Sequence, residues 1–277
     1  MITRACISIN NRCDLACGYC HFHEKGSVIH AADMDVIGVL NNITSYIEKH
    51  GIPLFKLGFV GNGEPLLDFP KLKDYILHID GYISRGSIAA YTITNGLSAD
   101  REKLVFFMEH GVNVGFSLDG IPEIHNKWRC GSFSRVMGAV SLYKELNGNY
   151  PSMNCTVGRD ILLHQEETIE FFRQFDNRIT FSRMVGRYGI SLEEYREFLR
   201  HACERLNVRT GGYDCTMYGG KCAAGMDNLF YANGNVYICG NCIDLPPLCS
   251  SDTPLDEIHF PVTDFDRRSC FKEGVVK

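Results

Sequence analysis

Residues 5–20 read Ala5-Cys-Ile-Ser-Ile-Asn-Asn-Arg-Cys13-Asp-Leu-Ala-Cys17-Gly-Tyr-Cys20, a short apolar run that leads directly into three cysteines. The run over residues 5–10 contains two isoleucines and ends in asparagine, which predicts a β-strand. The cysteines then fall on the loop that leaves the carboxyl end of this strand. Because parallel α/β folds build their sites from such loops, we expect the functional site here.

Five further segments are short, apolar and bounded by Gly, Asn, Asp or Pro, and are expected strands: residues 54–61, 88–95, 112–118, 152–157 and 179–185. Helical spacing of apolar residues predicts helices over residues 33–50, 100–110, 133–146, 166–175 and 191–206. Asp100, Ser132 and Ser191 are expected helix N-caps, and Glu194 stands three residues after Ser191, as in a capping box. Six strand–helix units predict an α/β fold, a partial, open (β/α)6 version of the eight-unit TIM barrel.

The composition is that of an ordinary globular protein, with 45% hydrophobic and 22% charged residues among 277. A net charge of −5 gives no electrostatic reason to bind nucleic acid or an anionic membrane. No apolar run approaches the roughly 20 residues that span a bilayer, and the first residues do not read as a signal peptide, so we expect a cytoplasmic protein. Thirteen clustered cysteines in that reducing compartment indicate metal or iron–sulfur ligation rather than disulfides.

The alternation of strands and helices stops after Asn207, which divides the chain into a barrel over residues 1–207 and a small extension over residues 208–277. The extension is rich in glycine and carries six cysteines: Cys215, Cys222, Cys239, Cys242, Cys249 and Cys270. Residues 229–238 predict a β-hairpin whose turn is Asn233-Gly234. A hairpin brings its flanking cysteines together, as a shared metal cluster requires.

The first three cysteines, in a C-x3-C-x2-C spacing, are suited to iron–sulfur chemistry. Three thiolates hold three irons of a [4Fe–4S] cube and leave the fourth iron open to a ligand. The alternative from the residues alone is a zinc site completed by His21 or His23.

This loop resembles the signature of the radical S-adenosylmethionine (radical SAM) superfamily, in which Tyr19 stands where an aromatic residue usually precedes the third cysteine. The resemblance implies that Cys13, Cys17 and Cys20 bind a [4Fe–4S] cluster whose open iron chelates S-adenosylmethionine. One-electron reduction then releases a 5′-deoxyadenosyl radical, which abstracts hydrogen from a substrate. The cofactor carries this chemistry, while the protein supplies position and exclusion of water.

Three further motifs follow the ends of expected strands. Gly61-Asn-Gly63-Glu64-Pro65 is similar to the family's G-G-E-P segment, which implies that Gly63 and Glu64 meet the ammonium group of S-adenosylmethionine. Thr94-Asn95-Gly96 is similar to the edge that contacts the ribose in the family. The alternative for each of these two motifs is an ordinary turn.

The third motif is Ser117-Leu-Asp119-Gly120, with His125, Arg129 and Gly131-Ser-Phe after it. It resembles a stretch of sulfatase-maturing enzymes and related peptide-modifying radical SAM enzymes. Carried over, Ser117 and Arg129 contact the carboxylate of S-adenosylmethionine, a task that suits the planar guanidinium. The alternative for Arg129 alone is a surface arginine.

The extension resembles the SPASM and twitch extensions behind many such barrels, because Cys222, Gly234 and Cys239 have their spacing and Cys215 precedes them. The resemblance implies one auxiliary [4Fe–4S] cluster held by Cys215, Cys222 and Cys239. The fourth ligand is left open among Cys242, Cys249 and Cys270, with Cys242 and Cys270 included in the expected metal set. The alternative is a zinc ribbon that includes Cys242.

The remaining cysteines receive separate expectations. Cys6, Cys155 and Cys203 fall in strand or helix patterns and are expected to be buried. Cys130 follows Arg129 at the catalytic end and is a candidate hydrogen-atom donor, as is one of Cys242 and Cys249. The alternative for each is a non-functional thiol.

Four residues are weaker candidates for substrate contact and are expected to be structural or solvated: His21, His23, Asp119 and Tyr213. Gly240 stands where sulfatase-maturing enzymes carry an aspartate base, which argues against sulfatase maturation.

The leading hypothesis is a radical SAM enzyme that modifies a ribosomally made precursor peptide by epimerisation, a thioether link or a carbon–carbon crosslink. Its expected partners are the precursor peptide and an electron donor such as flavodoxin or ferredoxin, without nucleic acid or membrane. No leader-binding segment is expected before the first strand. The alternatives are a twitch-type dehydrogenase of a small molecule and, from another class, a non-catalytic zinc- or iron–sulfur-binding protein.

Overall fold

The computed structural model describes residues 1–20, 33–209, 213–261 and 264–275. Its main feature is one nine-stranded sheet in the order β11-β10-β9-β1-β2-β3-β4-β5-β6. From β1 to β6 every neighbouring pair is parallel. These six strands are β1 (Arg4–Ser8), β2 (Phe55–Val60), β3 (Ile88–Thr94), β4 (Asn113–Ser117), β5 (Ser152–Val157) and β6 (Ile179–Arg183).

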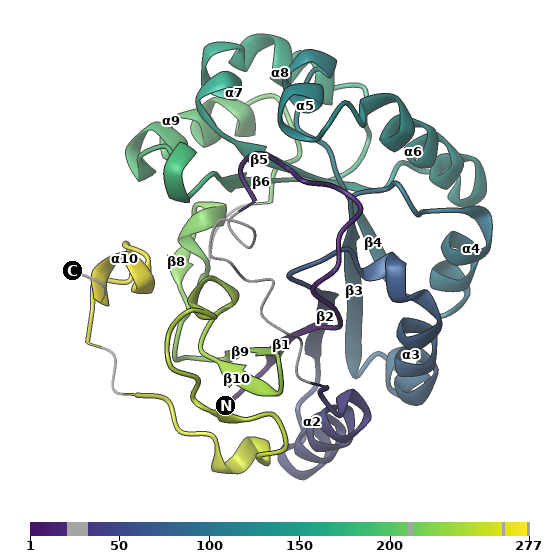
Figure 1. The fold of residues 1–277 in the computed structure, drawn as a ribbon, viewed down its shortest axis with the longest axis vertical. Helices are drawn as coiled ribbons and strands as arrows, with labels where there is room; N and C mark the ends of the chain where they lie inside the picture. Colours follow the sequence, from purple (N-terminus) through teal and green to yellow (C-terminus); the bar gives the residue numbers. More distant parts are fainter. Residues whose placement is uncertain (21–32, 210–212, 262–263, 276–277) are drawn as a thin grey trace.

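Helices cover the outer side of this curved sheet, and Figure 1 shows them following one another around an open arc. They are α2 (Val36–His50), α3 (Phe69–Ser84), α4 (Arg101–Glu109), α5 (Pro122–Trp128), α6 (Phe133–Asn147), α7 (Arg159–Leu163), α8 (Gln165–Phe172) and α9 (Leu192–Cys203). The architecture confirms the expected partial, open barrel of the α/β class. None of the described helices is both long and apolar enough to pass through a bilayer.

Alternation along the strands separates an apolar outer face from a polar inner face. On β4, β5 and β6 the residues Phe116, Cys155 and Phe181 are fully buried in the core beneath the helices. Their strand neighbours Ser117, Asn154 and Ser182 are only half-buried and lie on the opposite, inner side. The barrel therefore has a polar inner wall at the carboxyl ends of β4–β6.

The extension is formed by β7 (Tyr213–Asp214), β8 (Lys221–Cys222), β9 (Asn228–Ala232), β10 (Asn235–Tyr237), β11 (Cys249–Ser250) and α10 (Phe271–Val275). The expected hairpin is confirmed, because β9 and β10 pair antiparallel around Asn233 and Gly234, which both have positive φ.

The extension covers both edges of the open barrel. At one edge, β9 pairs in parallel with β1. At the other, residues 207–209 bond β6, since the Ile179 amide donates to Asn207 (2.9 Å) and the Arg209 amide donates to Ile179 (2.9 Å). In Figure 1 the green and yellow C-terminal segment accordingly fills the gap between α9 and α2. The domain boundary at residue 207 stays a prediction.

The structure differs in part from the expected helices, N-caps and buried cysteines. Helix α3 was missed, because Pro70 and Gly81 punctuate its pattern, although Leu72, Ile76 and Ile79 are fully buried in the core. Asp100 and Ser191 do cap their helices, the latter in a capping box.

Ser132 does not cap its helix, because its hydroxyl lies 2.9 Å from His125 Nε2 instead. Cys155 is buried as expected, but Cys6 is half-buried and faces Tyr91, and Cys203 is exposed at the end of α9.

The turn of the hairpin provides a stability test. Gly234 has φ +75°, so Gly234→Ala places a side chain in the left-handed region and is expected to lower the free energy of unfolding by about 1–2 kcal/mol. Gly81→Ala is the matched control, because Gly81 is helical with open space around its Cβ position, and it should raise stability by about 0.5–1 kcal/mol. Urea unfolding measures both. Equal effects of the two substitutions would contradict this account of the turn.

Candidate functional site

The three cysteines of the loop after β1 lie close to one another. Burial raises the pKa of the Cys17 thiol to about 12, and the negative charges of Cys13 and Cys20 contribute to this rise. Burial also raises the pKa of Cys13, which receives a hydrogen bond from the Leu15 amide (3.5 Å). The amide of Cys20 donates to the carbonyl of Cys17 (3.0 Å), so the loop turns back on itself between the second and third cysteine.

The loop after β2 is fastened to this cysteine loop by backbone contacts. The Glu64 amide donates to the Arg12 carbonyl (2.7 Å), and Asn10 Nδ2 donates to the Glu64 carbonyl (3.0 Å). A Cβ at Gly63 would lie 2.2 Å from the Arg12 carbonyl oxygen and 2.2 Å from Asn10 Oδ1. Only glycine allows this approach, so Gly63 is required for the two loops to meet.

Glu64 is a buried carboxylate with 3% of its surface exposed. Its Oε1 accepts from Thr94 Oγ1 (2.7 Å) and the Leu66 amide (3.1 Å), and its Oε2 accepts from the Asn95 amide (2.8 Å). Burial nevertheless raises the pKa of Glu64 to about 7, since these hydrogen bonds only partly offset desolvation. A cation close to this carboxylate would favour its charged form.

The strand-three motif connects Glu64 to the cysteine loop. Asn95 Nδ2 donates to Asp14 Oδ1 (2.6 Å) and lies 3.8 Å from Cys13 Sγ. Ser98 Oγ donates to the other oxygen of Asp14 (3.1 Å). The structure thus brings Thr94 and Asn95 to Glu64 and Cys13, and the carboxamide of Asn95 is held by Asp14.

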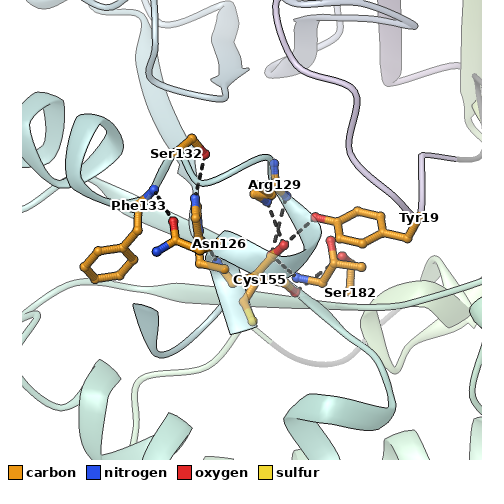
Figure 2. A network of polar contacts seen from close by, with 10 residues as sticks. Tyr19, Asn126, Arg129, Ser132, Phe133, Cys155 and Ser182 are labelled. Carbon is orange, nitrogen blue, oxygen red and sulfur yellow. Dashed lines mark hydrogen bonds and ion pairs between the residues drawn. The ribbon is translucent and has the colours of Figure 1, made fainter. Parts of the chain in front are cut away.

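A second charged group lies at the ends of β4 and β5. Asp119 is 1% exposed and forms a buried ion pair with Arg129, whose Nε lies 2.6 Å from Oδ2. The Tyr19 hydroxyl also donates to Oδ2, and the Thr156 amide donates to Oδ1 (2.8 Å). Figure 2 shows Tyr19 and Arg129 approaching one another from different segments of the chain. The expected surface alternative for Arg129 is therefore wrong, and Asp119 is structural, as expected.

The backbone of Asp119 is also fixed. Its amide donates to His125 Nδ1 (3.2 Å), and the other ring nitrogen of His125 lies 2.9 Å from Ser132 Oγ. Because Nδ1 accepts, Nε2 carries the proton of the neutral ring. Burial lowers the pKa of His125 to about 4, which keeps the ring neutral.

Between these groups the inner wall of the barrel carries small uncharged side chains. Ser117 pairs with Asn154 across β4 and β5, and Thr156 pairs with Ser182 across β5 and β6. The side chains of Ser117, Asn154 and Thr156 make no hydrogen bond within the described part of the chain. Asn154 extends over Gly115, where a Cβ would lie 2.6 Å from its Nδ2. This wall therefore offers free donors and acceptors to a ligand.

Cys130 is exposed and has φ +54°, an uncommon conformation for a residue other than glycine. It lies between buried Arg129 and Gly131 at the end of α5. The structure places its thiol at the surface next to the site, and its role as a hydrogen-atom donor stays a prediction.

Five of the six cysteines of the extension lie together, and we call them the C-terminal cysteine group: Cys215, Cys222, Cys239, Cys242 and Cys270. Burial raises the pKa of Cys215 well above its ordinary value, and the charges of Cys239 and Cys270 add to this. A hydrogen bond with Cys239 raises the pKa of Cys242. Burial raises the pKa of Cys222, and the negative charges of Cys270 and Cys239 add to this rise.

Cys249 is separate, since it lies in β11, pairs opposite Val236 and packs on the barrel core. Of the three candidates for the fourth ligand, Cys242 and Cys270 lie near Cys215, Cys222 and Cys239, whereas Cys249 does not.

The donors at both sites fit iron–sulfur clusters. Each consists of sulfur ligands, and backbone amides donate to Cys13 Sγ, Cys215 Sγ (3.4 Å) and Cys239 Sγ (3.4 Å). Such bonds stabilise the thiolates that clusters require. Among described residues, no three His, Cys, Asp or Glu side chains are arranged to hold a single metal ion.

Some predicted residues cannot be placed, and some functional contacts were missed. His21 and His23 lie outside the described residues, and of Tyr213 only the backbone is described, in β7. Sequence reasoning missed the bond between Tyr19 and Asp119 and the role of Asp14. The available sequence signal for a role of Asp119 was its position before a glycine at the end of a strand. Gly120 has φ +66° and lets the chain turn at this point.

Glu64 provides a pH test. Its folded pKa of about 7 lies above the unfolded value near 4.5, so the folded state holds the extra proton between these pH values. The contribution of Glu64 protonation to the free energy of unfolding is therefore fully present below about pH 4.5. Up to about 3 kcal/mol of it is lost as the pH rises through about 7. Glu64→Gln should abolish this part of the pH dependence in urea unfolding of the chain without added iron. An unchanged pH profile in the variant would contradict the assignment.

The separation of Cys249 from the C-terminal cysteine group provides a metal test. If the C-terminal cysteine group holds the expected auxiliary cluster, Cys215→Ala should lose about half of the iron bound after anaerobic reconstitution with iron and sulfide. Cys249→Ala is the matched control and should retain all of it. Iron analysis and absorbance near 400 nm measure this outcome, and iron loss in Cys249→Ala would show that the grouping is wrong.

Known proteins share this sequence pattern and fold. A cysteine-type anaerobic sulfatase-maturating enzyme of Clostridium novyi (strain NT) is 24% identical over 208 residues, which are 69% of this chain and 55% of that protein. The chain thus spans about half the length of this relative. The structure of anSMEcpe with bound AdoMet superposes with a TM-score of 0.71 at 20% identity, over 92% of this chain and 80% of that one. The structure of Streptococcus suis SuiB bound to S-adenosylmethionine superposes with a TM-score of 0.72 at 12% identity, over 95% of this chain and 64% of that one.

At these identities the solved structures establish the fold, which is that of the two AdoMet-binding proteins. The radical SAM superfamily model matches residues 7–172, the segment that contains the end of β1, strands β2 to β5, the three-cysteine loop, Glu64, Asn95 and Arg129. This match covers more than half of the 277 residues. The chain therefore belongs to the radical SAM superfamily.

Proposed function

We propose that this chain reductively cleaves S-adenosylmethionine and uses the resulting 5′-deoxyadenosyl radical to abstract hydrogen from a ribosomally made peptide. The observation that carries the proposal is the placement of a buried carboxyl group, Glu64, and a buried cation, Arg129, on either side of one three-cysteine loop. A [4Fe–4S] cluster on Cys13, Cys17 and Cys20 would supply the electron for this cleavage.

The charges match the amino-acid part of S-adenosylmethionine. An ammonium group near Glu64 would lower the raised pKa of this carboxylate and would be held by it. A carboxylate would pair with Arg129, next to the hydroxyl of Ser117 at the end of β4. Because Thr94 and the Asn95 amide already orient Glu64, the charge would need little rearrangement when the ligand binds.

The inner wall supports a peptide as the substrate. Within the described part of the chain, the side chains of Asn154 and Thr156 make no hydrogen bond, and they carry no charge. A peptide backbone presents alternating uncharged N–H and C=O groups, which such side chains bind. A solved structure of anSMEcpe holds both AdoMet and the Cp18Cys peptide, at a TM-score of 0.70 and 20% identity over 92% of this chain.

Position 240 bears on which peptide reaction this is. A Cβ at Gly240 would lie 2.9 Å from the ring of Phe230, so the position has no room for an aspartate without repacking. The base expected there in sulfatase maturation is therefore lacking at this position. This favours an outcome such as epimerisation or a thioether or carbon–carbon link over sulfatase maturation.

The C-terminal cysteine group supports an auxiliary [4Fe–4S] cluster, because it supplies more than the four thiols that one cluster needs. Cys222 and Cys242 are buried there beside Ile238 and Phe271. The cluster would exchange electrons with the substrate radical or with a flavodoxin or ferredoxin.

S-adenosylmethionine cleavage tests the proposal. The reconstituted protein, given a strong reductant, should form 5′-deoxyadenosine, while the Cys13/Cys17/Cys20→Ala variant forms at least 100-fold less because three ligands are lost. Cys203→Ala is the matched control, since Cys203 is exposed on α9, and it should retain wild-type cleavage. Equal yields from the wild type and the triple variant would refute the proposal.

The peptide part is tested by mass spectrometry of a candidate precursor peptide after turnover in deuterated buffer. A gain of one mass unit at one residue indicates epimerisation, and a loss of two indicates a crosslink or dehydrogenation. Modification of a polyol instead of every peptide offered would favour the small-molecule alternative.

A further inference from the structure

We propose that Asp119 is a positioning residue that couples the ligand-binding Arg129 to the three-cysteine loop through the hydroxyl of Tyr19. The inference rests on the proposed function, because it concerns the same S-adenosylmethionine site. It assigns a role to a carboxylate that the proposed function leaves without one.

The oxygens of Asp119 bring together three separate segments. Tyr19 reaches Oδ2 from the cysteine loop, Arg129 reaches it from the end of α5, and the Thr156 amide reaches Oδ1 from β5. The carboxylate is 1% exposed, so water does not replace any of these donors. Since the Asp119 amide is also bound to His125 Nδ1, the residue is fixed at both its backbone and its side chain.

The contact with Asp119 determines which edge of Arg129 is left for a ligand. Its Nε donates to Oδ2 at 2.6 Å, and its Nη2 lies 3.4 Å from Oδ1. The side of the guanidinium formed by Nε and Nη2 is therefore occupied. A carboxylate that pairs with Arg129 in the bidentate manner must use the edge formed by Nη1 and Nη2.

Tyr19 transmits this geometry to the cysteines, because it stands between Cys17 and Cys20 in sequence. Its ring lies against the guanidinium of Arg129, with 5.5 Å from Cζ to the ring centre. The neighbouring Gly18 amide donates to the Trp128 carbonyl (2.9 Å), directly before Arg129. The loop that carries the second and third cysteines is thus held against the segment that carries the arginine.

The test is a double-mutant cycle on S-adenosylmethionine binding by the reconstituted protein. The dissociation constant and the change in the electron paramagnetic resonance spectrum of the reduced protein on ligand addition are measured for the wild type, Tyr19→Phe, Asp119→Asn and the double variant. Tyr19→Phe removes one hydroxyl and leaves all charges in place. Asp160→Asn is the matched control. Asp160 contacts Trp128 Nε1 (2.7 Å) and Lys127 Nζ (2.7 Å) on α5, the helix that precedes Arg129, but it contacts neither Tyr19 nor Arg129.

Tyr19→Phe is expected to weaken binding at least fivefold and to alter the spectral change in the otherwise wild-type chain. It should have a smaller effect in the Asp119→Asn background, because a neutral amide oxygen already weakens the shared contact. Asp160→Asn should bind like the wild type. Wild-type binding by Tyr19→Phe, or the same fold-change in both backgrounds, overturns this inference alone. A wild-type protein that neither binds nor cleaves S-adenosylmethionine overturns the proposed function and this inference with it.

Discussion

Strand β1 is the element on which the rest of the structure depends, because it is hydrogen-bonded in parallel on both sides. Its pairing with β2 sets the register of the barrel, and its pairing with β9 joins the extension to the same sheet. The loop after its carboxyl end carries the first three cysteines. Parallel pairing forces the ends of neighbouring strands to one side of the sheet, so Glu64 and Asn95 reach this loop without any long connection.

Two buried charges flank that loop and are held in different ways. Among the described residues, Glu64 accepts only from uncharged donors and has no countercharge, so burial raises its pKa. Arg129 has a countercharge in Asp119. A zwitterionic ligand would supply the missing cation to one and a second anion to the other. Because of this asymmetry, we expect the first site to respond to pH and the second to depend on the geometry of its ion pair.

Much of the fold follows from local sequence pattern. The six parallel strands alternate or run apolar as helix-covered strands do, and Asn233-Gly234 dictates its turn. Helix α3 was missed because Pro70 and Gly81 look like breakers, although Pro is tolerated in the first turn of a helix. Ser132 failed as a cap because a tertiary partner, His125, competes for its hydroxyl. No local pattern reveals such competition.

The candidate site divides in the same way. Motifs at strand ends place Cys13, Glu64 and Asn95, since topology alone brings strand ends together. The contact between Tyr19 and Asp119 spans 100 residues and depends on how α5 returns to the loop, which spacing does not encode. Likewise, the sequence leaves Cys249 equivalent to Cys270, and only the pairing of β11 with β10 separates Cys249 from the other thiols.

The central claim is that a ligand with an amino-acid group binds directly at the three-cysteine loop. Mössbauer spectroscopy of the protein reconstituted with iron-57, with and without S-adenosylmethionine, tests it most directly. The account predicts that one iron site changes its isomer shift when the ligand is added and that Cys13→Ala abolishes the change. Iron signals that are identical with and without S-adenosylmethionine would contradict it.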